Sequence, residues 1–247
     1  MLKPYFSYIP IVLLLATLLP GCGGSESGQK VIVLELREVT GQTLPNGFVL
    51  GTDKWHIDFD NGALAAALAQ QGFSSGQAEE FKSKTLEHLK TYFFGIRISF
   101  SSKPPEIGST AKPGDRQGAA TLGENPYNVI SVCNGGPDSK YAGYALYDFA
   151  DNARVENNSG KAWGYQKLGV FIDVISRCMW MRGSLDYFAK NTALMLAHEI
   201  GHSLGLSHYD SDPNIMHSQC VIGTSNPAFI ETHCLQLLVS LPGPGRL

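Results

Sequence analysis

Short apolar runs recur along the chain and predict the strands of a sheet. In some of them apolar and polar residues alternate, which is typical of a strand with one buried face. Others are apolar throughout, which is typical of a strand buried on both faces. We expect strands at Val31–Leu36, Trp55–Phe59, Ile96–Phe100, Val129–Val132 and Gly169–Ile175, and a further strand around Tyr141 to Tyr147 is left open.

Apolar residues at helical spacing predict three helices. In the first, Phe81, Leu86, Leu89 and Phe93 share one face, and Ser75 precedes the helix as its N-cap. Because helices and strands mix without strict alternation, the pattern predicts an α+β fold. The expected helices are Gly76–Phe94, Leu185–Leu204 and Pro227–Leu241, and the Pro-, Gly- and polar-rich stretches Ser102–Asn125 and Asn134–Lys167 are expected to be mainly loops.

The N-terminus carries an apolar stretch of another kind. Tyr8–Leu19 follows Lys3 and has the length of a signal-peptide core, which is short for a membrane span. The residues that follow, Leu19-Pro20-Gly21-Cys22 and then a Gly/Ser-rich run, resemble a bacterial lipoprotein signal, in which cleavage leaves a lipidated cysteine. Secretory cleavage nearby, or an uncleaved anchor, is the alternative.

This pattern predicts the domain organisation and the location. We expect a signal peptide at residues 1–21, a flexible spacer at 22–30 beginning with lipidated Cys22, and one domain at 31–247 with its core at about 55–241. The protein is then exported and lipid-anchored to the bacterial cell envelope, at the outer membrane or the cell surface.

Composition adds few constraints. The hydrophobic fraction of 43%, the charged fraction of 17% and the formal net charge of −3 are those of an ordinary globular domain. Since no long basic block occurs, we predict no nucleic-acid partner, and we expect a monomer.

The cysteines fit an exported domain. If Cys22 is lipidated, four cysteines remain, which suggests two disulfides with three possible pairings. We favour Cys133–Cys178 with Cys220–Cys234, and free buried thiols are the alternative.

The segment His198–His208 carries the chemistry. On a helix, His198 and His202 lie one turn apart on one face, so both imidazoles reach one metal ion. Gly205 can end the helix in a left-handed conformation, and the returning chain then delivers His208 as third ligand. Three protein ligands leave one coordination position open, as in catalytic zinc sites. Glu199 adjoins the first ligand, where a general base would act on a water molecule.

The same residues resemble a known family. The His-Glu-x-x-His-x-x-Gly-x-x-His segment, followed by Asn214-Ile215-Met216-His217, is similar to the zinc signature and Met-turn of the metzincins, and most similar to the matrixins. The resemblance implies Met216 beneath the histidines, an active-site helix, a C-terminal helix and a twisted, mostly parallel sheet. It also implies an antiparallel edge strand that binds substrate. Our candidate for that strand is Gly169–Ile175, and the alternative is that this strand is fully buried.

The resemblance implies a zinc-dependent endopeptidase with one catalytic Zn²⁺ and a peptide or protein substrate. A surface lipoprotein that binds zinc without catalysis and a hydrolase of non-peptide amides are the alternatives.

The sequence also offers two minor candidate sites. Cys133 begins a sequence loosely similar to a zinc-blocking switch, and a structural Ca²⁺ is considered at Asp138, Asp148, Asp151 and Glu156, where a solvated loop is the favoured interpretation.

Overall fold

The structure is a computed structural model that describes residues 43–44, 47–103, 120–122, 125–150, 153–163, 165–178, 183–211, 213–219 and 227–243. The chain divides into two units, residues 1–38 and 39–247, and all described residues belong to the second. The predicted signal peptide, Cys22, the spacer and the strand at Val31–Leu36 therefore lie outside the described residues. Within the described part, no helix has the length and apolarity needed to cross a membrane.

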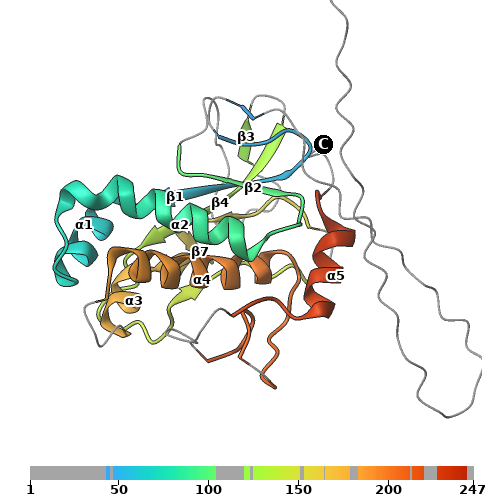
Figure 1. Cartoon of the computed structure of the whole chain (residues 1–247). Coiled ribbons are helices and arrows are strands. Elements are labelled where there is room, and N and C mark those ends of the chain that lie inside the picture. The colour runs from blue at the N-terminus through green and yellow to red at the C-terminus, as the bar shows by residue number, and fades with distance from the viewer. Residues whose placement is uncertain are drawn as a thin grey trace, which may run out of the picture. The chain divides into compact units, whose positions relative to one another are not determined.

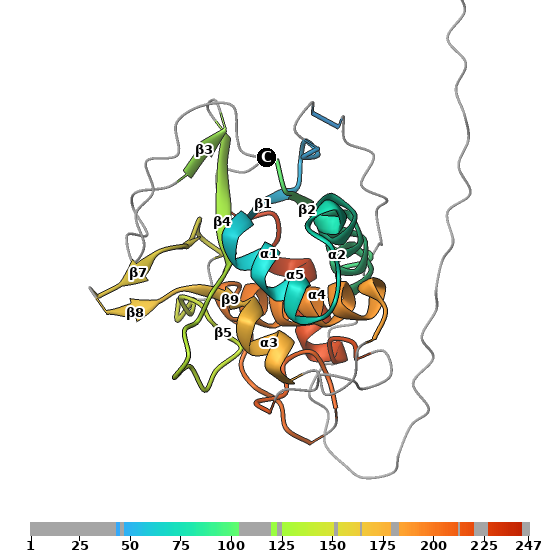
Figure 2. The same cartoon turned by 90° about the vertical axis from the view of Figure 1, so that its left-hand side faces the viewer.

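The central sheet is mostly parallel, as the resemblance implied. Its strand order is β2-β1-β4-β9-β5, and β3 and β6 pair with β4 outside this path. Neighbouring strands are parallel except at the β5/β9 and β3/β4 pairs, and a separate β7/β8 hairpin extends from the same flank as β5 (Figure 2). The strands are β1 (Asp53–Phe59), β2 (Ile98–Ser101), β3 (Ala120–Leu122), β4 (Asn125–Cys133), β5 (Gly143–Tyr144), β6 (Asn157–Asn158), β7 (Lys161–Ala162), β8 (Gln166–Lys167) and β9 (Gly169–Phe171).

Helices α2 and α4 cover one face of the sheet and run side by side (Figures 1 and 2). Between them, Phe81 and Phe188 pack with their ring centroids 4.9 Å apart. The alternate residues Trp55, Ile57 and Phe59 of β1 face the same core. The helices are α1 (Asn61–Gln70), α2 (Ala78–Tyr92), α3 (Ile172–Cys178), α4 (Leu185–Ser203) and α5 (Glu231–Ser240), with a 3₁₀ turn at Ser75–Gln77 before α2.

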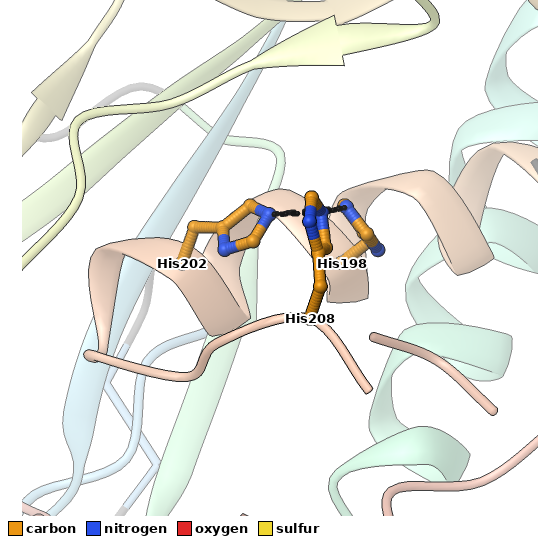
Figure 3. Close-up of side chains that lie close together, drawn as sticks. All are labelled: His198, His202 and His208. Carbon is orange, nitrogen blue, oxygen red and sulfur yellow. Dashed lines mark hydrogen bonds between the residues drawn. The ribbon is translucent and has the colours of Figure 1, made fainter. Parts of the chain in front are cut away.

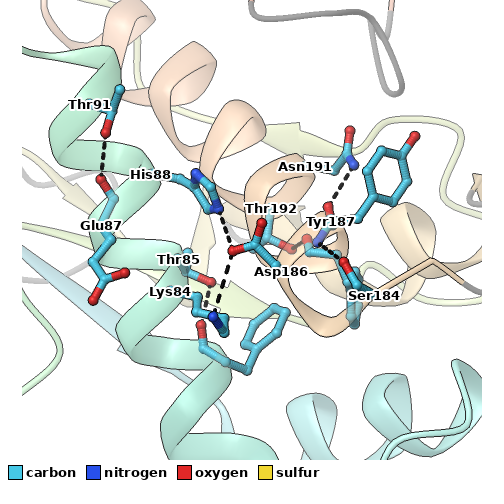
Figure 4. A network of polar contacts seen from close by, with 12 residues as sticks. Lys84, Thr85, Glu87, His88, Thr91, Ser184, Asp186, Tyr187, Asn191 and Thr192 are labelled. Atoms are coloured by element: carbon cyan, nitrogen blue, oxygen red, sulfur yellow. Dashed lines mark hydrogen bonds and ion pairs between the residues drawn. The ribbon is translucent and has the colours of Figure 1, made fainter.

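Polar contacts fix the N-terminal end of α4 (Figure 4). The Ser184 hydroxyl accepts a hydrogen bond from the Tyr187 amide at 3.1 Å, which caps the helix. Asp186, in the first turn, pairs with His88 at 2.9 Å and with Lys84 at 3.8 Å, both on α2. The carboxylate lies where the helix dipole favours negative charge, so these contacts set where α4 begins.

One predicted strand is wrong in part, and one helix was not predicted. The strand predicted at Gly169–Ile175 ends at Phe171, and helix α3 follows it. In the helix, Ile172 and Ile175 share one face in the core. Asp173 accepts hydrogen bonds from the Gly135 and Gly136 amides, which also favours the helix. Helix α1 was not among the helices predicted from the sequence. The Asp60 carboxylate caps α1 through the Ala63 amide at 2.9 Å, and an alanine-rich sequence favours the helix after it.

The other differences concern boundaries. Strand β3 interrupts the predicted loop at Ser102–Asn125, and β4 begins at the last residue of that loop. Strand β5 lies within the stretch from Tyr141 to Tyr147, where a further strand is one of the expectations. The N-cap at the 3₁₀ turn is Ser74, one residue before the predicted Ser75. The last helix begins at Glu231, four residues later than predicted.

Candidate metal centre

The C-terminal half of α4 delivers two of the three histidines. The run Ala193–Ala197 is buried and strongly helix-forming, and it carries His198 and His202 out on one face. Their rings are nearly perpendicular, with centroids 4.7 Å apart. The helix therefore presents two imidazoles to a single point, as the spacing of four residues predicted.

A tight turn ends α4 and returns the chain toward the histidines. Gly205 adopts φ +87°, which an L side chain rarely adopts. The Leu206 amide donates to the Gly201 carbonyl at 2.9 Å, and the Gly205 amide donates to the His202 carbonyl at 3.0 Å. These two bonds form a Schellman motif, after which the chain reaches His208.

The three imidazoles point their Nε2 atoms toward one another (Figure 3). His202 Nε2 lies 3.1 Å from His198 Nε2 and 3.1 Å from His208 Nε2, and the third pair is separated by 3.3 Å. A tetrahedral zinc ion with Zn–N bonds of about 2.0–2.1 Å separates its ligand atoms by about 3.3 Å. The triad therefore has the dimensions of a zinc site.

Main-chain carbonyls determine which ring nitrogen is protonated. His198 Nδ1 lies 2.7 Å from the Ile215 carbonyl, and His202 Nδ1 lies 2.9 Å from the Leu206 carbonyl. A carbonyl only accepts, so each Nδ1 carries the proton and each Nε2 presents a lone pair. Two lone pairs 3.1 Å apart repel each other unless a cation lies between them, which is a second reason why these residues fit a metal ion.

Burial keeps the two helical histidines neutral. Burial, with a smaller contribution from the neighbouring histidines, lowers the pKa of His198 to about 4 and the pKa of His202 to about 4. A neutral imidazole is the form that binds a metal. Both side chains are therefore ready as ligands at neutral pH.

Glu199 lies beside the triad and is buried. Desolvation by burial raises the pKa of its carboxyl group to about 8. Gly143 of β5 lies directly against it, since a Cβ added at that position would lie 2.5 Å from Glu199 Oε1. The sequence motif did not reveal Gly143, because the contact joins residues that are distant along the chain.

Met216 forms the floor of the site. It is fully buried, and a Cβ at Gly201 would lie 2.5 Å from its Sδ atom, so the helix has a glycine where the methionine packs. Asn214 orients this turn: its amide nitrogen donates to the Tyr209 carbonyl at 2.7 Å, and its amide oxygen accepts from the Met216 amide at 2.8 Å. The Met-turn is thus tied to the segment that follows His208.

Most of the chain matches a single family model. The model described as Matrixin matches residues 51–229, a span that contains the three histidines, Glu199 and Met216. The chain belongs to the matrixin family. Among curated proteins no significant match was found.

The antiparallel strand at the end of the strand order is β5 and not the predicted candidate. Strand β9 lies between β4 and β5, and Gly169, Val170 and Phe171 are all buried, so the alternative of a buried strand is confirmed. Strand β5 ends the strand order and pairs antiparallel with β9. Gly143, which lies against Glu199, is therefore on this edge of the sheet.

The predicted disulfide Cys133–Cys178 is wrong in this structure, because both cysteines are free. Cys133 is buried at the end of β4 with its Sγ 3.8 Å from the Leu168 carbonyl, whereas Cys178 is exposed at the end of α3. Burial raises the pKa of the Cys133 thiol to about 11, which also disfavours a zinc-blocking thiolate. Cys234 is a free thiol, and its predicted partner Cys220 lies outside the described residues.

Among the described residues, the candidate calcium ligands do not form a group with metal-ligand geometry. The Asp148 carboxylate accepts hydrogen bonds from the Ala150 amide at 3.2 Å and the Ala153 amide at 2.7 Å, so it ties a turn together. Asp151 lies outside the described residues. Within the described ranges, the histidine triad is the one group of three or more residues with metal-ligand geometry.

Proposed function

We propose that the domain is a zinc-dependent endopeptidase in which His198, His202 and His208 hold one Zn²⁺ and Glu199 is the general base. The observation that carries the proposal is the convergence of three Nε2 atoms within 3.3 Å of one another beside a buried carboxyl group. Membership of the matrixin family supports a metallopeptidase acting on peptide or protein substrates.

The roles of the residues follow from their chemistry. When bound, the zinc ion supplies Lewis acidity that lowers the pKa of a water molecule toward about 7 and polarises the scissile carbonyl. The three histidines leave one position open for water and substrate. Glu199 accepts the proton of the attacking water and passes it to the leaving amine. The proximity of zinc would lower the pKa of Glu199 from its metal-free value of about 8, so the carboxylate form is available near neutral pH.

Strand β5 is the proposed binding edge for an extended substrate. A peptide that adds to an edge strand forms main-chain hydrogen bonds regardless of its sequence. Because Gly143 is on β5 and lies against Glu199, a peptide paired there has its backbone next to the general base. This placement supports cleavage of a peptide bond over hydrolysis of a small non-peptide amide.

We also propose that the enzyme is an exported lipoprotein anchored through Cys22 to the bacterial cell envelope. The support is the sequence alone: an apolar stretch at Tyr8–Leu19, the cysteine three residues after it and a Gly/Ser-rich spacer. Mass spectrometry of the membrane-extracted protein tests this directly. A diacylated N-terminal Cys22 is expected, and an unmodified N-terminus elsewhere would contradict it.

The deciding experiment is cleavage of an unbiased peptide mixture, read by mass spectrometry. A form that begins at Gly23 is compared with its Glu199→Ala variant and with a chelator-treated sample. Cuts inside peptides, seen only in the untreated wild type, support the endopeptidase. Stoichiometric zinc without any cut in peptides favours the non-catalytic binding module, for which Glu199 would have no evident use.

A further inference from the structure

The segment after β5 contributes a residue to the metal centre that lies outside the zinc signature. The Tyr147 hydroxyl lies 3.0 Å from the Gly205 carbonyl and 2.7 Å from Ser207 Oγ. Its ring lies beside that of His202, with centroids 5.8 Å apart. Tyr147 therefore contacts the turn between the second and third histidines at both ends.

The proton count of the hydroxyl gives each contact a direction. The Gly205 carbonyl only accepts, so the single proton of the Tyr147 hydroxyl is donated to it. The Ser207 hydroxyl then donates to Tyr147 Oη. One phenol oxygen thus joins the residue that ends α4 to the residue that immediately precedes His208.

Neighbouring contacts fix Tyr147 itself on the end of α4. The Ser203 hydroxyl donates to the Leu146 carbonyl at 2.9 Å, and the Asp148 amide donates to the His202 carbonyl at 3.1 Å. The residues on both sides of Tyr147 are therefore bound to the helix end. The phenol is held in place before any metal arrives, which lowers the entropic cost of using it.

The third ligand needs such support more than the other two. His198 and His202 are fixed by the helix and by carbonyls at their Nδ1 atoms. His208 lies beyond the helix, in a segment without regular structure, and is exposed. The position of its ring therefore depends on the turn from Gly205 to Ser207.

We propose that Tyr147 is a positioning residue for zinc: its hydroxyl holds the Gly205–Ser207 turn so that His208 Nε2 meets the other two ligand atoms. The proposal rests on the proposed function in that the ion is zinc. Since Tyr147 follows β5 by three residues, it also joins the proposed substrate edge to the ligand turn.

The test is a zinc titration of the full chain in detergent against a competing chelator. Tyr147→Phe removes both hydrogen bonds and keeps the ring, and we expect its zinc Kd to rise about 10-fold, at the lower end of the effect of residues that orient ligands. Ser207→Ala removes one partner. Because both variants break the same contact, the double variant should bind zinc within about twofold of Tyr147→Phe alone.

Two further readouts separate positioning from general stability. With Co²⁺ in place of zinc, Tyr147→Phe should shift or weaken the visible absorption bands, which report ligand geometry. The matched control is Tyr165→Phe, which removes an exposed hydroxyl on the β7/β8 hairpin and should leave both the zinc Kd and the Co²⁺ spectrum unchanged.

The outcomes are distinct. A Tyr147→Phe chain that binds zinc within twofold of wild type, with an unchanged Co²⁺ spectrum, overturns the proposal even if its metal-free form melts at lower temperature. A wild-type chain that binds no zinc overturns the proposed function and this proposal together. Zinc binding by the wild type with the expected loss in Tyr147→Phe supports the positioning role.

Discussion

Gly143 of β5 and Glu199 of α4 lie so close together that any side chain on the glycine would displace the carboxylate. The distance of 2.5 Å from a built Cβ to Oε1 is far below van der Waals contact, and Glu199 Cγ and Cδ lie within 2.8 Å of the same point. The strand proposed to bind substrate therefore shapes the position of the proposed general base.

The first prediction is that Gly143→Ala lowers kcat/KM by about 10²-fold, because a displacement of about 1 Å in a catalytic group is enough for such a loss. Zinc affinity should stay within about twofold of wild type, since no histidine is moved. Gly76→Ala, where the nearest atom to the new Cβ is 3.7 Å away, is the control and should retain full activity. Full activity in Gly143→Ala would show that this contact has no catalytic role.

The second prediction concerns the stability of the metal-free chain. The carboxyl group of Glu199 has a pKa of about 8 in the folded state against 4.5 in the unfolded state. The folded state therefore holds the proton more tightly, and its contribution to stability is complete below pH 4.5 and is lost as the pH rises to about 8. At pH 7 the loss is roughly 3 kcal/mol.

Glu199→Gln removes this dependence. With chelator present, urea denaturation should show that the free energy of unfolding of the variant rises relative to that of the wild type between pH 4.5 and pH 8. His198 and His202 titrate alike in both chains, so they do not contribute to this difference. Glu79→Gln, at an exposed carboxylate, serves as control. A constant difference between the wild type and Glu199→Gln across this range would contradict the burial of a protonated Glu199.

The third prediction concerns the floor of the site. Gly201→Ala brings a methyl group into the space of Met216 Sδ and should cost about 1–3 kcal/mol of stability. Adding Met216→Ala to the same chain makes room, so the two changes should be non-additive. Thermal melts of the two single variants and the double variant measure this. Strict additivity would show that the two side chains do not compete for space.

The fourth prediction links the triad to folding. Free zinc at 100 times its Kd should stabilise the wild type by about 2.7 kcal/mol, because the ion binds the folded state. His202→Ala leaves two ligands and should abolish the rise in Tm on adding zinc. His88→Ala, on α2 at the N-terminal end of α4, should retain that rise. A rise that persists in His202→Ala would mean that zinc binds elsewhere.

The parts of the site that were predictable are local in sequence. The histidines, Glu199 and Gly205 lie within eleven consecutive residues, and Met216 follows shortly after, so spacing alone indicated one metal centre. Helix α4 was equally predictable, because its N-cap, apolar face and terminal glycine all occur at regular offsets. Each of these signals depends on residues near one another in the chain.

The parts that were missed depend on contacts between distant residues. Gly143 and Tyr147 carry no signal in their own neighbourhood, and each meets α4 or its terminal turn more than fifty positions later. The boundary between β9 and α3 was missed for a related reason. An apolar run suits a buried strand and a buried helix equally, and the contact of Asp173 with Gly135 and Gly136 decides between them.

The two helical ligands are oriented by oxygen atoms of the main chain and not by side chains. Every amino acid at positions 206 and 215 supplies the same carbonyl, so no missense mutation there deletes the acceptor that holds His202 or His198. The Leu206 and Ile215 side chains are thereby free to diverge during evolution, within the limits of core packing, while the tautomers of the ligands stay unchanged. A substitution of the side chain at either position therefore leaves the acceptor for the histidine Nδ1 in place.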